Sequence, residues 1–249
     1  MDTLRGLRLL RDDPEWLMKL LVGTVLLLTA NFIPLLGQVV LMGWAALITR
    51  RVAAGSEGLP PLTFDLDYLS KLLGPGFKGF IVGFVWGLPL VFLVMGFFGC
   101  FGFAMVTGAA TASEAGDAGP LVMVCMTSVM VVVMPVLIAL GSLPAAMAMV
   151  RAEVADDISA GLDFGAVFHM TRTVFRELFV GTLVLMLVAM GMTLLGMLMG
   201  CVGVLPAQVA IFAARAHFGG QLYRLYVERG GTPVRIGPVD LAPAAAATL

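Results

Sequence analysis

Long apolar runs are the feature that most constrains what this chain can fold into. They occupy residues 17–49, 77–108, 120–150, 178–204 and 206–218. A helix needs about 20 apolar residues to cross the hydrocarbon core of a bilayer. The chain of 249 residues is 60% hydrophobic and 12% charged, and a soluble domain carries about twice that charged fraction. The sequence therefore predicts an all-α polytopic transmembrane bundle, and we expect the lipid bilayer to be its main environment.

The first apolar run is interrupted by TANFIPLLGQ, residues 29–38. As one helix, residues 17–49 would be about 50 Å long, which exceeds a hydrocarbon core of about 30 Å. One bent helix, two short helices and a re-entrant pair all remain open. Basic residues flank the run on both sides, with Lys19 before it and the Arg50–Arg51 pair at its end. Because cytoplasmic loops are enriched in Lys and Arg, we favour a turn at Asn31–Pro34 that brings both flanks to one face.

The remaining charges support six crossings with both termini in the cytoplasm. The loop 109–119 carries two acids and no basic residue. With turns at 31–34, 109–119 and about 200–206, every Lys and Arg falls on the cytoplasmic side or in the inward-leading part of the last helix. This predicts a multi-pass membrane protein, which we expect in an inner (cytoplasmic) membrane. Its expected parts are a cytoplasmic segment 1–16, one transmembrane domain 17–228 and a disordered Pro- and Ala-rich tail 229–249.

The chain also compares with itself at an offset near 100 residues, which suggests a parallel tandem repeat of about 34–108 and 135–204. Each copy would contain an amphipathic helix at the membrane surface, at residues 65–73 and 164–178. Gly74-Pro75-Gly76 predicts a break after the first of these helices. The second has no Gly or Pro before the next apolar run, so it either lies in the interface or continues into that run.

Glycines and one arginine are the candidate packing or functional positions within the apolar runs. Gly79, Gly83 and Gly87 are four residues apart, a spacing that lets another helix approach closely. Such a strip serves packing within the bundle, a membrane-protein partner or a second copy of the chain. Arg215 either extends to the inner interface or is a buried charge facing a partner or a cavity. Three polar or turn-forming residues of the first run complete the set: Asn31, Pro34 and Gln38.

No catalytic constellation is present in the sequence. It lacks a P-loop, a GxSxG motif and an HExxH motif. The three cysteines show no CxxC spacing, and His217 has no second histidine spaced to help it hold a metal. We therefore expect a protein that is not an enzyme, with no cofactor and no metal. The absence of a Lys/Arg-rich run also argues against nucleic acid as a partner.

Two stretches resemble a known family. DDPEWLMKLLVG (residues 12–23), followed by NFIPLLG, and AHFGGQLYR (residues 216–224) are similar to the opening and closing segments of a prokaryotic membrane family of unknown function, domain of unknown function 4013. The likeness extends over most of residues 10–226, although Phe218–Gly219 stand where a bulkier pair is expected. The resemblance implies an integral membrane protein and no particular activity. It directs attention to four residues of the closing segment: His217, Gln221, Tyr223 and Arg224.

Two functions remain open from the sequence. A non-enzymatic membrane scaffold or accessory subunit is favoured by the glycine strips and the missing catalytic residues. A small-solute permease or carrier is the alternative, suggested by the repeat and by the proline-containing helices. A polar cavity lined by residues such as Asn31, Gln38, Thr127, Gln208 or Arg215 would favour transport, whereas a dry core with an exposed apolar groove would favour the scaffold.

Overall fold

The computed structural model describes residues 2–29, 35–56, 58–115, 128, 138, 140–199 and 202–240, without the side chains of 100–115. The described part of the chain is helical and contains no strand. Residues 140–155 form one further helix, called helix 140–155 below. The other helices are α1 (Arg5–Asp12), α2 (Trp16–Thr29), α3 (Leu36–Ala53), α4 (Leu66–Ala115), α6 (Ile158–Leu162), α7 (Phe164–Thr173), α8 (Phe175–Leu198) and α9 (Val204–Glu228).

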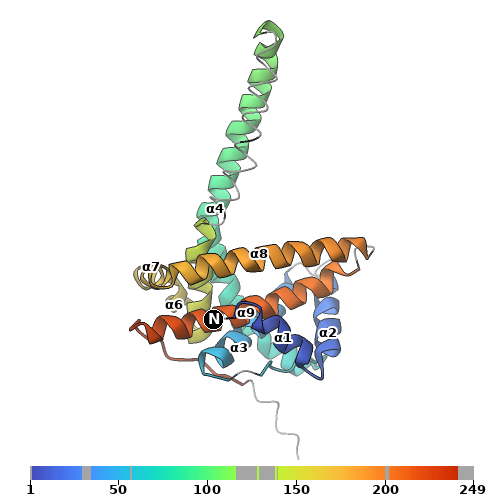
Figure 1. The fold of residues 1–249 in the computed structure, drawn as a ribbon, viewed down its shortest axis with the longest axis vertical. Coiled ribbons are helices and arrows are strands. Elements are labelled where there is room, and N and C mark those ends of the chain that lie inside the picture. Colours follow the sequence, from blue (N-terminus) through green and yellow to red (C-terminus); the bar gives the residue numbers. More distant parts are fainter. Residues whose placement is uncertain are drawn as a thin grey trace, which may run out of the picture.

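The helices form a body from which one helix projects (Figure 1). The later part of α4 rises away from the body, whereas α8 and α9 run across it. At 50 residues, α4 is about 75 Å long, far more than a bilayer core requires. It remains helical to Ala115, so the first part of the loop expected at 109–119 is helix instead. The two long apolar helices α4 and α8 run in different directions (Figure 1).

Two helices, α4 over Leu66–Gly99 and α8 over Phe175–Leu198, are long and apolar enough to cross a membrane. Few residues of either segment are buried in the protein, which distinguishes them from the core helices of a soluble protein. α8 exposes large apolar side chains along its length, including Leu187 and Leu195. These helices give weak support for membrane association, and the six crossings expected from the sequence remain a prediction.

The first apolar run forms two helices rather than one. α2 ends at Thr29 and α3 begins at Leu36, and they pack closely enough that a Cβ on Gly37 would stand 1.7 Å from the Leu26 carbonyl oxygen. Residues eleven apart in one continuous helix would be about 16 Å apart along its axis. The flanking helices thus agree with the hairpin that the basic residues predicted. Asn31 and Pro34 themselves lie outside the described residues.

The break predicted at Gly74-Pro75-Gly76 is wrong, because α4 is helical through Pro75. Gly76 instead admits a neighbouring backbone: a Cβ there would stand 1.9 Å from the Val39 carbonyl oxygen of α3. The break occurs in the second surface segment, where α7 and α8 are separated at Val174. There the burial of Met170 and Val174 shows that tertiary packing, rather than a Gly or Pro, accompanies the change of direction.

The apolar face predicted for 164–178 is divided between the core and the surface. Val167, Val174 and Leu178 are buried, whereas Phe164 and Phe168 are exposed. α9 has a more central role, because it contributes to both apolar cores. One core joins it to α1, α2, α3 and the start of α4, and the other joins it to helix 140–155, α7 and α8.

Candidate functional site: a polar cluster beside an apolar pocket

The closing segment of α9 packs tightly against two other helices. A Cβ on Gly220 would stand 2.6 Å from the Val52 Cβ of α3, and one on Gly219 would stand 2.7 Å from the Val150 Cγ2 of helix 140–155. The two adjacent glycines therefore allow α9 to contact both helices at one level. This explains the Gly-Gly pair of the closing segment as a packing requirement and brings the charged ends of α3 and helix 140–155 together.

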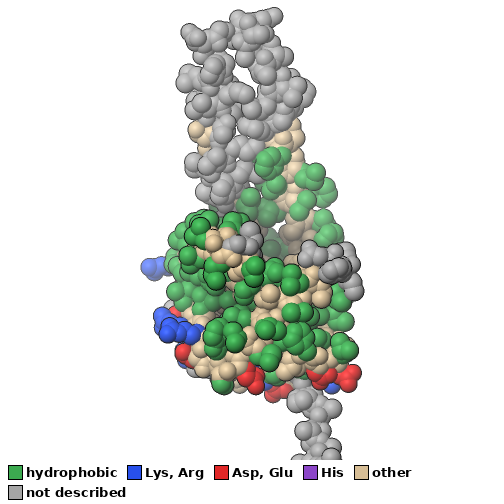
Figure 2. Space-filling view, turned by 90° about the vertical axis from the view of Figure 1, so that its right-hand side faces the viewer, with side chains coloured by type: hydrophobic (Ala, Val, Ile, Leu, Met, Phe, Trp, Pro, Cys, Tyr) green, Lys and Arg blue, Asp and Glu red, His purple; other side chains and the backbone are tan. Residues whose placement is uncertain are grey.

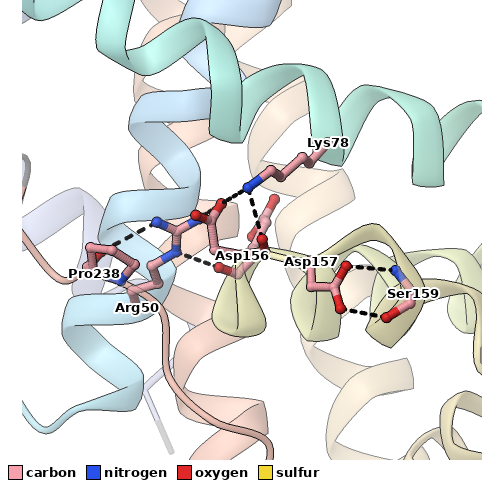
Figure 3. Close-up of polar contacts among 7 residues, drawn as sticks. Arg50, Lys78, Asp156, Asp157, Ser159 and Pro238 are labelled. Carbon is pink, nitrogen blue, oxygen red and sulfur yellow. Dashed lines mark hydrogen bonds and ion pairs between the residues drawn. The ribbon is translucent and has the colours of Figure 1, made fainter.

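A buried arginine joins these charged ends (Figure 3). The Arg50 side chain is 1% exposed. Its Nε donates to the carbonyl oxygen of Glu153 at 2.5 Å, its Nη2 donates to Asp156 Oδ1 at 2.7 Å, and its Nη1 donates to the carbonyl oxygen of Pro238 at 3.2 Å. One guanidinium thus connects α3, helix 140–155 and the segment that follows α9.

A second cation, Lys78, also forms an ion pair with Asp156. Lys78 Nζ of α4 lies 3.0 Å from Asp156 Oδ1 and donates to the Asp156 carbonyl oxygen at 2.9 Å. Asp156 has a φ of 55°, a backbone conformation that is uncommon outside glycine. The two cations hold it there, and the next residue, Asp157, begins α6 by accepting from Ser159 N at 3.1 Å (Figure 3).

Glu153 completes what we call the polar cluster: Thr49, Arg50, Lys78, Glu153 and Asp156. The Thr49 hydroxyl donates to Glu153 Oε2 at 2.7 Å. Glu153 lies past the apolar run that ends at Val150. Burial raises the pKa of its carboxyl, and the Thr49 hydrogen bond and the charges of Arg215 and Arg50 oppose this only partly. From the sequence, the Arg50–Arg51 pair indicated topology only, and no local motif joins the members of the cluster.

The raised pKa of Glu153 predicts a pH dependence of stability. Its neutral form is favoured in the folded protein, so this contribution is fully present below the ordinary pKa of 4.5 and is lost as the pH rises through the folded-state value. The unfolding temperature of Glu153→Gln is expected to change less with pH than that of the wild type, over the range between these two pKa values. Thermal unfolding in a pH series measures this. Glu228→Gln, at the end of α9, should keep the wild-type profile, and an unchanged profile in Glu153→Gln would contradict the assignment.

The segment 231–240 is bonded to the body, although the sequence predicted disorder for 229–249. Tyr223 OH donates to the Val234 carbonyl oxygen at 3.2 Å and accepts from Val234 N at 2.9 Å. Gly237 N donates to the Val154 carbonyl oxygen at 2.8 Å, and Arg51 pairs with Asp240. Disorder was expected from composition, but these backbone and side-chain bonds offset the entropy of ordering. Residues 241–249 lie outside the described chain.

The other residues of the closing segment have separate roles. His217 is 2% exposed, and its Nδ1 lies 3.0 Å from Gln221 Nε2. Gln221 Nε2 also donates to the Asp2 carbonyl oxygen at 3.2 Å, so this pair connects α9 to the start of the chain. Arg224 is exposed, and Gln38 of α3 is exposed as well. The structure therefore brings His217 and Gln221 together but does not join them to Gln38 or Arg224.

The predicted glycine strip makes only moderate contacts. A Cβ on Gly79 would stand 3.7 Å from Met42 Cε, one on Gly83 would stand 3.3 Å from Met149 Sδ, and one on Gly87 would meet nothing within 4 Å. The tightest approach between α3 and α4 is at Gly43 and Gly76 instead. A Cβ on Gly43 would stand 2.0 Å from the Leu72 carbonyl oxygen. Oligomer contact through the strip remains a prediction.

Arg215 lies between two cavities. The smaller cavity, of about 30 Å³, is lined by Glu153, Met149 and Phe212 among others. The larger cavity, of about 350 Å³, lies between helix 140–155, α8 and α9. Arg215 itself is exposed, eleven residues into α9 and thus about 17 Å from its first residue. Its Nη2 donates to Met149 Sδ at 3.2 Å, a weak acceptor. Arg215 is therefore the charge that the larger pocket offers to an occupant.

The sequence of the chain matches one known protein family. It matches a family described as "Protein of unknown function (DUF4013)" over residues 26–216. The match includes NFIPLLG and ends at the first residue of the closing segment. No curated protein and no solved structure matches the chain. Because the match extends over more than half of its residues, the chain belongs to the DUF4013 family.

Proposed function

We propose that this protein is a non-enzymatic membrane scaffold or an accessory subunit of a membrane complex. The observation that carries this proposal is that the charged side chains of the polar cluster bond to other parts of the chain. Arg50 and Lys78 each bond to other parts of the chain, and the Glu153 carboxylate accepts from Thr49. Charged groups that bond across several helices in this way hold the helices together, which is a structural role. The lack of catalytic motifs in the sequence agrees with this role.

The proposed placement is a multi-pass one in an inner membrane, with the polar cluster and both termini on the cytoplasmic side. Figure 2 shows one face of the body that is widely covered by hydrophobic side chains, with acidic side chains along its lower edge and basic ones mainly at its left edge. Such a division suits a body whose apolar part faces lipid and whose charged part faces water. The exposed apolar side chains of α8, such as Leu187 and Leu195, are the surface we propose for contact with lipid or a membrane partner.

A small-solute permease or carrier is the second candidate, and the pocket beside Arg215 is the observation that favours it. Of the polar residues expected to line a transport cavity, Arg215 lines this pocket, whereas Gln38 and Gln208 do not. Asn31 and Thr127 lie outside the described residues. A pathway for a polar solute needs polar groups along its walls, and this pocket is lined mainly by apolar side chains. The geometry supports the scaffold better.

Photo-crosslinking combined with a flux assay tests the proposal. A benzoylphenylalanine at Leu187, 63% exposed on α8, is expected to give one discrete adduct with a membrane polypeptide in intact cells. The same probe at Arg224, exposed on α9, is the matched control and should give none. Proteoliposomes of the purified chain should show no saturable solute uptake. Saturable uptake without a position-specific adduct would overturn the scaffold and favour the permease.

A further inference from the structure

The larger pocket is a lateral opening with apolar walls. It lies between helix 140–155, α8 and α9, and its volume is about 350 Å³. Its walls include Met147, Leu178, Leu185 and Phe218, and the hydroxyls of Ser142 and Thr182 lie among them. Ligand pockets generally hold about 300 to 1,000 Å³ and combine apolar walls with a few polar groups. The pocket therefore has the size and the lining of a binding site for one apolar chain.

Among the described residues that line this pocket, Arg215 is the one that carries a charge. Within the described residues its guanidinium donates to Met149 Sδ and forms no ion pair. Asp156 is shared by Arg50 and Lys78, which leaves Glu153 to balance Arg215 from a distance. The three cations Arg50, Lys78 and Arg215 thus face two acids, Asp156 and Glu153, and burial favours the neutral form of Glu153. The positive charge at the Arg215 end of the pocket is therefore not fully balanced, which favours an anionic group there.

The dimensions exclude a helix as the occupant. One turn of an α-helix, about 10 Å across and 5.4 Å long, fills about 420 Å³, which is more than the whole pocket. A polar solute would gain little from apolar walls and would lose its hydration. A hydrocarbon chain is much narrower than a helix, so part of its length can enter the pocket, and a guanidinium binds phosphate oxygens through two parallel hydrogen bonds.

We propose that this pocket binds one acyl chain of an anionic phospholipid and that Arg215 binds its phosphate. The inference rests on the proposed membrane location of the chain, and it assigns a ligand that the scaffold role does not require. Ser142 and Thr182 also line the pocket and make part of its wall polar. The bound lipid then fills the space between α8 and α9 and becomes part of the packed body.

Native mass spectrometry of the purified chain tests this, with phosphatidylglycerol and phosphatidylcholine of equal chain length as the probes. The wild type is expected to retain one phosphatidylglycerol in preference to phosphatidylcholine. Arg215→Gln should lower that preference about tenfold, because a hydrogen bond to a charged group is lost. Arg215→Lys should retain most of it. Ala189→Phe, which fills the pocket wall, should reduce retention of both lipids.

Two matched controls keep the test specific. Arg224→Gln removes an exposed arginine of the same helix, and Leu194→Phe enlarges an exposed residue of α8 that is outside the pocket; both should retain lipid as the wild type does. A wild-type preference in Arg215→Gln, or unchanged retention in Ala189→Phe, overturns the proposal. Retention of oleate with both phospholipids excluded overturns the phospholipid assignment. If Arg215→Gln does not fold, Arg215→Lys and Ala189→Phe decide. Lipid retention is measured on the isolated chain, so it can fail independently of the crosslinking test for a partner.

Discussion

Replacing Arg50 by alanine is expected to lower the free energy of unfolding by about 3 to 5 kcal/mol, the usual cost of removing one partner of a buried charged pair. The loss leaves the carbonyl oxygens of Glu153 and Pro238 without their donors and Asp156 with Lys78 as its one cation among the bonds described. It also removes one of the bonds between helix 140–155 and α3, leaving the Thr49–Glu153 bond. Unfolding in mixed micelles with increasing denaturing detergent, followed by circular dichroism, measures the change.

The neighbouring arginine provides the control. Arg51 pairs with Asp240, but their side chains are 22% and 61% exposed, and such partly hydrated pairs contribute about 0 to 1 kcal/mol. Arg51→Ala is therefore expected to unfold within about 1 kcal/mol of the wild type. Equal losses in the two variants would mean that burial of Arg50 is not what makes its bonds important.

The second large effect is expected at Gly43. A Cβ there would stand 2.0 Å from the Leu72 carbonyl oxygen, and a backbone atom cannot move aside as a flexible side chain can. Gly43→Ala must therefore force α3 and α4 apart, at a cost of about 3 kcal/mol, the upper part of the usual range for overpacking. Gly76 faces Val39 in the same crossing, so Gly76→Ala should have a similar effect. The detergent unfolding assay used for Arg50 measures both.

Gly87→Ala tests whether the effect belongs to the crossing or to glycine itself. No atom lies within 4 Å of the added Cβ, and alanine in a helix interior is favoured over glycine by about 0.5 to 1 kcal/mol. This variant should be slightly more stable than the wild type. If Gly87→Ala were destabilised as much as Gly43→Ala, the close approach of α3 and α4 would not be the cause.

Local sequence properties predicted the helices but not how they pack. Apolar runs and turn residues indicated an all-α chain and separate helices α2 and α3, because helix formation and lipid exposure depend on residues close in sequence. The tight crossing was missed because spacing shows where a flat strip exists, as at Gly79, Gly83 and Gly87, but not which neighbour approaches it. Gly43 and Gly76 lie on two different helices, so no spacing within one helix could reveal their contact.

The polar cluster could not be predicted for a related reason. Arg50 and Glu153 are 103 residues apart, and Arg50 and Pro238 are 188 apart. The Arg50–Arg51 pair was recognised as a charged end of a helix, yet the two residues differ greatly in burial. Which of two adjacent arginines becomes buried depends on where helix 140–155 and segment 231–240 dock. That information is distributed over the whole chain.

The bond between Arg50 and the Pro238 carbonyl oxygen has a consequence for how the protein is made. The ribosome synthesises Pro238 188 residues after Arg50, so α3 is complete long before one acceptor of its guanidinium exists. During that interval the Arg50 Nη1 must donate to another acceptor, such as water. Maturation of this end of the protein is therefore a late step of biogenesis, finished when the segment after α9 emerges and closes over α3.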